Sequence, residues 1–271
     1  MHLDEVEFTI FDTETTGLDP QLGDRIIEIA ALRFKGDEKI SSFQSLINPL
    51  RDLPLSAQRI NNISPEMLEN APTIDKIMPS FLEFIKGSYL CAYNASFDFS
   101  FLENELKLIG LPSISDKMIV DLLKMSKELL PGLPRYALWF VAESLGIKAS
   151  ELHRAFRDVE VSFEIFKKLK RIFFERGLFD LDSFLNLFCL EGSFLNNLNL
   201  QKISKIQEAI DLKAKIKIKY FSHKDAEVSE REIIPSQIKE EKYLVGFCLL
   251  RKEERTFNIE RILNLEILNG F

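Results

Sequence analysis

The chain has 271 residues, of which 46% are hydrophobic and 28% are charged, and this composition excludes an intrinsically disordered protein. Its 35 basic and 42 acidic residues give a net charge of −7, which excludes a strongly basic protein that binds nucleic acid mainly by neutralising phosphates. An acidic protein can still act on a polyanion if bound cations reverse the charge locally.

The cysteines and the hydropathy pattern predict where the protein works. Cys91, Cys189 and Cys248 are odd in number and each lies in an apolar run, so we expect free buried thiols. The N-terminus is acidic, unlike a signal peptide, and no run of about 18 apolar residues could span a bilayer. We therefore expect a cytoplasmic protein with no membrane partner.

The first part of the chain mixes predicted strands with predicted helices. Apolar runs that end at turn residues predict strands at Phe8–Phe11, Arg25–Phe34, Lys39–Ile47, Tyr89–Tyr93 and Met118–Val120. Helical spacing and end signals predict helices starting at Ser64 and covering Ile74–Ile85, Phe97–Ile109, Leu133–Leu145 and Ala155–Arg176. This order favours an α/β fold, with a mixed sheet flanked by helices.

The pattern changes in the last quarter of the chain. A partly helical connector and a short amphipathic helix, Ile203–Lys213, come before a series of short strands. These strands are predicted at Lys215–Tyr220, Glu230–Ile238, Tyr243–Leu250, Arg255–Ile259 and Leu263–Leu268. We predict a small β-barrel there, and divide the chain into residues 1–176, a connector at 177–202 and residues 203–271.

Asp12-Thr13-Glu14 is the first candidate for chemistry. Asp-x-Glu also occurs at Asp158 and Asp225, so the pattern alone carries little weight. Only the first copy lies at the end of a predicted apolar strand, where sites gather in α/β sheets. A strand places Asp12 and Glu14 on one face, and two carboxylates so close repel each other unless a cation lies between them.

Two later segments add polar residues at comparable places. Asn94-Ala95-Ser96-Phe97-Asp98 follows the predicted strand at Tyr89–Tyr93, and helix capping alone could explain its acid. His153 precedes the last long helix of this part of the chain, and Asp158 falls in the first turns of that helix. Each segment is weak alone, and a lone histidine is more often structural than catalytic.

Taken together and in this order, the three segments resemble the DEDDh (DnaQ-like) 3′→5′ exonuclease family, which includes the proofreading subunit of bacterial replicative polymerase. The resemblance covers about residues 5–175 and implies an RNase H-like fold with two divalent ions, Mg²⁺ or Mn²⁺. It implies that four carboxylates hold the metals: Asp12, Glu14, Asp98 and Asp158. It also implies that His153 deprotonates the attacking water, for which an unperturbed pKa near 6.5 is suitable.

The resemblance also implies a substrate. Residues next to the motifs would contact the terminal nucleotide: Thr13, Thr15, Thr16, Gly17, Leu18, Asn94 and Phe97. Leu18 is either a wedge against the last base or a core residue. We expect the protein to act at nucleic-acid 3′ ends, with DNA favoured over RNA, and to work in DNA repair or proofreading beside a DNA polymerase or repair partner.

Residues 203–271 resemble a WYL domain, a small Sm-like or SH3-like β-barrel found in bacterial regulators. The tripeptide that names the family is Lys242-Tyr243-Leu244 here, so its Trp is missing. The resemblance implies binding of a single strand or a nucleotide-like ligand through an arginine cluster: Arg231, Arg251, Arg255 and Arg261. A solvated charged face is the alternative interpretation.

Two other functions stay open from the sequence. One is an RNA-trimming exoribonuclease of the same fold, which a comparison of ribonucleotide and deoxyribonucleotide substrates would separate. The other is a ligand-sensing or nucleic-acid-sensing regulator that keeps the nuclease fold only as a scaffold. Against the scaffold interpretation, every expected catalytic position is filled.

Overall fold

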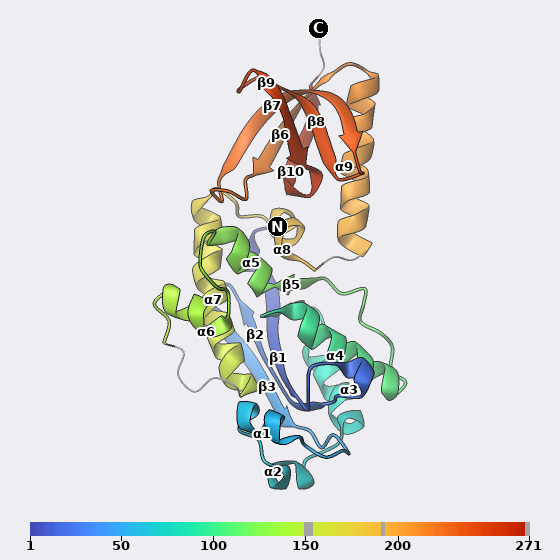
Figure 1. Ribbon diagram of the computed structural model, residues 1–271, viewed down its shortest axis with the longest axis vertical. Coiled ribbons are helices and arrows are strands. Elements are labelled where there is room, and N and C mark those ends of the chain that lie inside the picture. Colours follow the sequence, from blue (N-terminus) through green and yellow to red (C-terminus); the bar gives the residue numbers. More distant parts are fainter. Residues whose placement is uncertain (149–153, 191–192, 269–271) are drawn as a thin grey trace.

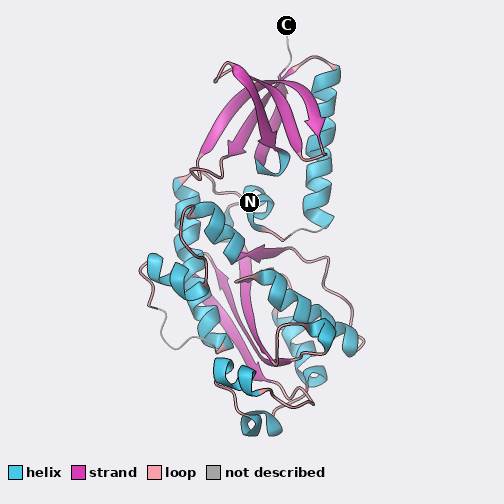
Figure 2. Ribbon diagram, in the orientation of Figure 1, coloured by secondary structure: helices cyan, strands magenta, loops and turns pink. Residues whose placement is uncertain are grey.

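The computed structural model describes residues 1–148, 154–190 and 193–268 (Figure 1). The predicted base His153 therefore lies outside the described residues. Within them, the first part contains both helices and strands, and a group of strands follows one long helix in the last part (Figure 2).

The first part is built on a five-stranded mixed sheet with the order β3-β2-β1-β4-β5. Its strands are β1 (Glu7–Thr15), β2 (Ile26–Lys35), β3 (Glu38–Leu46), β4 (Tyr89–Ala92) and β5 (Ile119–Asp121). The first three run antiparallel in sequence, whereas β4 pairs parallel with both β1 and β5. The carboxyl ends of β1, β4 and β5 therefore meet at one edge of the sheet.

Helices cover both faces of this sheet, as the predicted fold class requires (Figure 1). They are α1 (Leu55–Asn61), α2 (Pro65–Glu69), α3 (Ile74–Phe84), α4 (Ala95–Leu108), α5 (Leu122–Leu129), α6 (Leu138–Ser144) and α7 (Ala155–Glu175). One hydrophobic core joins α3 and α4 to the sheet, and another joins α5 and α7 to it. Short 3₁₀ turns lie at Leu3–Glu5 and Pro20–Leu22.

The last part of the chain forms a second, antiparallel sheet with the order β10-β6-β7-β8-β9. Its strands are β6 (Lys215–Phe221), β7 (Val228–Lys239), β8 (Tyr243–Cys248), β9 (Glu253–Asn258) and β10 (Ile262–Leu268), with a 3₁₀ turn at Ile259–Arg261. Helix α9 (Ser193–Asp211) packs on this sheet. Strands β9 and β10 are not paired with each other in the described residues, so the expected antiparallel strands are present without a closed barrel.

Helix α8 (Leu181–Phe188) lies between the two parts (Figure 1). Its Phe184 and Phe188 are fully buried in the same core as β1 and α7. On another side of the helix, the Asn186 amide donates to the Glu260 carbonyl at 3.0 Å and accepts from Lys202 Nζ at 2.9 Å. The segment predicted as a connector is thus packed against both sheets.

Charged side chains add to this junction. Arg261 donates two hydrogen bonds to Glu128 at the end of α5, at 2.8 and 2.9 Å. His223 Nδ1 lies 3.1 Å from the same carboxylate, and Arg176 pairs with Glu227 at 2.7 Å. Arg261, which the sequence placed in a ligand-binding cluster, thus contacts the first part of the chain.

Several element boundaries differ from the prediction. The helix expected over Leu133–Leu145 is shorter: α6 begins only at Leu138, and residues 133–137 are not helical. Helices α1 and α5 were not predicted, and α9 begins ten residues earlier than expected, at Ser193. In the described part of the chain, no helix has the length and apolar character needed to cross a membrane.

Candidate active site

The site lies at the carboxyl end of β1, where the strand passes from the core to the edge of the sheet. The apolar residues Phe8, Ile10 and Phe11 are fully buried, and the alternation of a strand then brings Asp12 and Glu14 to one face. This confirms the expected orientation of the two acids. Glu14 lies directly opposite Glu28 of β2 in the strand pairing.

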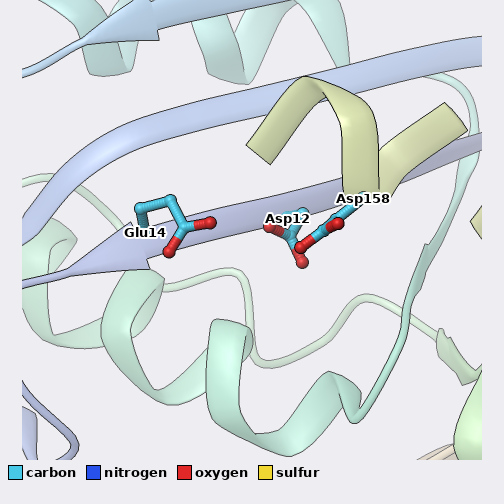
Figure 3. A group of neighbouring side chains, drawn as sticks. All are labelled: Asp12, Glu14 and Asp158. Carbon is cyan, nitrogen blue, oxygen red and sulfur yellow. The ribbon is translucent and has the colours of Figure 1, made fainter. Parts of the chain in front are cut away.

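Three carboxylates from two elements meet at this place. Oxygen atoms of Asp12, Glu14 and Asp158 all lie within 4.8 Å of one another. Figure 3 shows Asp12 and Glu14 projecting from β1 and Asp158 reaching them from the first turn of α7. Residues 12 and 158 are far apart in the sequence, so only the fold brings these acids together.

Asp98 joins the group from α4. This helix begins after β4, and its preceding residue Asn94 has a φ of 63°, which turns the chain sharply out of the strand. Asp98 Oδ1 accepts from the Thr13 backbone amide at 2.9 Å and from the Thr13 hydroxyl at 2.7 Å. Asp98 is thereby held against β1 at Thr13, the residue between Asp12 and Glu14.

The acids disturb one another's ionisation. Burial, and then the charges of Asp98, Asp158 and Glu14, raise the pKa of Asp12 well above its usual value. Burial, and then Asp158 and Glu28, raise the pKa of Glu14 to about 8. Burial also raises the pKa of Asp98 to about 7, against the opposing effect of the two Thr13 hydrogen bonds. A divalent cation would relieve this crowding, because it stabilises the ionised form of each acid.

The donor set suits a hard cation. Carboxylate oxygens are the ligands that Mg²⁺ and Mn²⁺ prefer in proteins, and three of them here come within the span of a single coordination shell. The remaining predicted metal ligand, Asp98, lies outside this tight group of three but is close enough to raise the pKa of Asp12.

The loop after β1 holds the other residues predicted to contact substrate. Thr15 and Thr16 are buried, and the Thr16 hydroxyl accepts from the Arg25 amide and donates to Asp24, both at 3.0 Å. Asn61 of α1 donates to the Thr15 carbonyl at 3.1 Å. At Gly17 an added Cβ would lie 2.2 Å from Asp24 Oδ2, so a larger residue would displace the Asp24 side chain.

The structure separates the alternatives for several predicted residues. Leu18 is 83% exposed, so its interpretation as a core residue is wrong, whereas the wedge hypothesis stays a prediction. Asn94 is exposed at the edge of the site, and Phe97 is half-buried against Phe101. The Thr13 hydroxyl is engaged by Asp98.

The sequence reasoning missed three residues that shape this site. The fully buried Glu28 forms an ion pair with the partly exposed Arg154 beside the acids, and Asp121 at the end of β5 contributes to the raised pKa of Asp98. Asp121 could have been found, because it follows the apolar residues Ile119 and Val120 as Asp12 follows Phe11. The partners of Glu28 could not, because they are far from it in the sequence.

The comparison with protein families decides between the interpretations of this geometry. Residues 9–166 match the Exonuclease family, and residues 201–267 match the WYL domain. The chain belongs to the exonuclease family. This confirms the resemblances on which the sequence analysis depended.

Known relatives agree with this assignment of the exonuclease domain. Over 165 residues the chain is 42% identical to DNA polymerase III subunit epsilon of Treponema pallidum, covering 60% of this chain and 76% of that protein. It is 37% identical over 176 residues to the PolC-type DNA polymerase III of Caldanaerobacter subterraneus, covering 64% of this chain and 12% of that polymerase. The chain thus spans about an eighth of the length of such polymerases.

Solved structures show the fold of the exonuclease domain. Exonuclease I of E. coli in complex with a dA16 oligonucleotide matches with a TM-score of 0.60 at 17% identity, over 90% of this chain and 55% of that one. The RNase H-like α/β fold is thereby established, with its mixed sheet flanked by helices. The coverage reaches beyond the exonuclease domain into the C-terminal part.

Proposed function

We propose that this protein is a 3′→5′ exonuclease that hydrolyses phosphodiester bonds at nucleic-acid 3′ ends by a two-metal mechanism, with DNA as the favoured substrate. One observation carries the proposal: carboxylates from β1 and α7 converge within 4.8 Å, and Asp98 of α4 is hydrogen-bonded beside them. The epsilon relative, a subunit of DNA polymerase III, supports the preference for DNA and a polymerase partner. We include a role in DNA repair or proofreading in the same proposal.

Each residue would have a separate task. Asp12, Glu14, Asp98 and Asp158 would hold two Mg²⁺ or Mn²⁺ ions, which supply a polarised phosphate and a stabilised leaving oxygen. His153 would accept the proton of the attacking water. Thr13 would orient Asp98 through its amide and hydroxyl. The loop from Thr15 to Leu18, with Asn94 and Phe97, would position the terminal nucleotide, and the exposed Leu18 would press against its base.

The test is digestion of 3′-labelled single and double strands, with and without Mn²⁺ or Mg²⁺. We expect release of terminal nucleotides that stops when EDTA is added. Asp12→Ala should lower the rate at least about 1,000-fold. Loss of the bound ions would remove several kcal/mol of transition-state stabilisation, and each loss of about 1.4 kcal/mol costs a factor of ten. Unchanged degradation by this variant would contradict the proposed metal site.

Two substrate series distinguish the proposed function from its two alternatives, an exoribonuclease and a sensor without nuclease activity. Matched deoxyribonucleotide and ribonucleotide strands test DNA against RNA, because only the 2′-hydroxyl differs between them. If neither series is degraded in the presence of metal, whereas a nucleotide or single strand binds the C-terminal sheet, the protein is a sensor on a nuclease scaffold.

For the C-terminal part, we propose a domain at residues 203–271 with a barrel-like fold of the Sm/SH3 class, joined by a connector at 177–202 to the exonuclease domain at 1–176. A single strand or nucleotide ligand would bind Arg231, Arg251 and Arg255, with Arg261 available only when it releases Glu128. A cytoplasmic setting is consistent with the free cysteines Cys91, Cys189 and Cys248, all of which are buried.

A further inference from the structure

A further acid, Glu28, lies beside the metal-binding candidates but is not one of them. Its side chain on β2 is fully buried, directly opposite Glu14 in the strand pairing. Side chains at directly opposed positions of an antiparallel pair lie on one face, about 5 Å apart at Cβ. An isolated charge in such a place would be very unfavourable, so its partners indicate its role.

Four N–H groups satisfy this carboxylate. Arg154 donates from Nε at 3.1 Å and from Nη2 at 2.9 Å, in the two-pronged geometry that holds a carboxylate most firmly. The Ala155 backbone amide donates at 3.1 Å, and the Gln44 side chain of β3 donates at 2.9 Å. The sheet is thus connected to the start of α7 through one buried side chain.

These contacts fix the distance between the two elements that supply the acidic group. Ala155 is the first residue of α7, and Asp158 follows within one turn of the same helix. Because a helix turn is rigid, an anchor on the Ala155 amide also fixes where the Asp158 carboxylate can reach. On the other side, the strand register fixes Glu28 relative to Glu14.

We propose that Glu28 is a positioning residue of the nuclease centre: through Arg154 and the Ala155 amide it holds Asp158 within reach of Asp12 and Glu14, and so sets the affinity of the acidic group for divalent ions. The inference rests on the proposed metal-dependent function. Partners of metal ligands commonly have this effect, and their loss typically costs about 10–100-fold in metal affinity or activity.

The chain contains a closely matched control. Glu105 of α4 is 1% exposed and accepts from Arg25 Nε at 2.8 Å, from Arg25 Nη2 at 2.7 Å and from the next backbone amide, Ile26, at 3.1 Å. Glu28 has the same kinds of donor: the Nε and Nη2 atoms of an arginine, Arg154, and the backbone amide of the next residue, Ala155. The acid on α4, Asp98, is in addition held directly by Thr13, so it does not depend on Glu105 alone.

The experiment measures Mn²⁺ binding to the full-length protein, by calorimetry and by the rise of Tm with Mn²⁺ concentration. We expect Glu28→Gln to raise the Mn²⁺ concentration for half-saturation about 10–100-fold. Glu105→Gln should lower the Tm in EDTA about as much as Glu28→Gln does. It should keep the Mn²⁺ concentration for half-saturation within about threefold of wild type, because a stability loss alone does not change the metal ligands. Glu28→Asp keeps a buried carboxylate to balance the charge of Arg154, so the variant should fold. Its side chain is one methylene group shorter and reaches the Ala155 amide less well, so Mn²⁺ binding should also weaken.

The outcomes separate the two proposals. If wild-type protein shows neither Mn²⁺-dependent stabilisation nor hydrolysis, the proposed function fails, and the role of Glu28 fails with it. If wild type binds Mn²⁺ but Glu28→Gln and Glu28→Asp both bind it as Glu105→Gln does, only the positioning role is overturned. Weaker binding in both Glu28 variants, with the Glu105 variant unchanged, supports it.

Discussion

The two sheets of this protein carry their charged residues in opposite ways. At the end of β1 the acids are largely buried, they raise one another's pKa, and their partners come from α4 and α7. In the C-terminal part, Arg251 and Arg255 are exposed and Arg231 is half-buried, and Arg255 approaches Glu253 of its own strand only at 3.8 Å. A buried charge needs a function or a partner to offset its desolvation, whereas an exposed charge needs neither. The acids are therefore the stronger indication of chemistry.

The largest expected difference between the two regions is in activity. We expect His153→Ala to lower the rate of 3′-end hydrolysis about 10²–10⁴-fold, the usual contribution of a general base. Arg255→Ala, assayed on a dinucleotide too short to reach the C-terminal sheet, is the matched control and should hydrolyse it at the wild-type rate. Equal losses in the two variants would show that the regions do not have separate roles.

The junction should show the next largest effect, on stability. Arg261→Ala removes both guanidinium hydrogen bonds from the Glu128 carboxylate, which is 13% exposed, and leaves it the His223 contact. We expect a loss of about 1.5–3 kcal/mol in the free energy of unfolding, measured with urea. Arg255→Ala, at an exposed position of the same sheet, should change it by about 0.5 kcal/mol or less. If both arginines cost the same, Arg261 does not join the two parts as the geometry indicates.

A pH series tests the crowding of the acids. The folded protein keeps a proton on Glu14 up to about pH 8, whereas the unfolded chain releases it near 4.5. The folded state binds more protons in this interval, so in EDTA stability should fall as pH rises from about 4.5 to about 8. Bound Mn²⁺ favours the ionised acid and should flatten this slope. A Tm that is independent of pH in EDTA would show that the acids are not crowded.

The smallest expected effect is on the C-terminal surface. Arg231→Ala and Arg255→Ala should each weaken binding of a single strand and reduce its salt dependence by about one phosphate contact. The measurement is fluorescence anisotropy with a labelled oligonucleotide at several salt concentrations. Binding that is unchanged in the double variant would favour the solvated charged face over the ligand site.

Much of the exonuclease domain could be predicted from local patterns. Strand β1 was recognised from a short apolar run, and the α7 helix from its spacing, so Asp12 and Asp158 were placed on the correct elements. Helix α5 was missed because it starts directly at the strand end, where Asp121 caps it by accepting from the Leu123 amide. Its apolar residues continue those of the strand without a turn between them.

Contacts between distant residues could not be predicted in the same way. Glu28 and Arg154 are 126 positions apart, and nothing in the composition of either segment shows that they pair. Arg261 was grouped with three other arginines because they share one domain, but its partner Glu128 belongs to the other. Side-chain partners across elements depend on the packing of helices on sheets, which a single sequence does not specify.

Helix α8 affects how the protein could be divided for experiments. A fragment ending at residue 176 would lack Phe184 and Phe188, two side chains that fill the core beneath β1. Removing a buried phenylalanine typically costs about 3–5 kcal/mol, which for two of them approaches the whole stability of an ordinary domain. If a fragment of that length is inactive, the cause would thus be the loss of core residues of the exonuclease domain, and not a requirement for the C-terminal sheet.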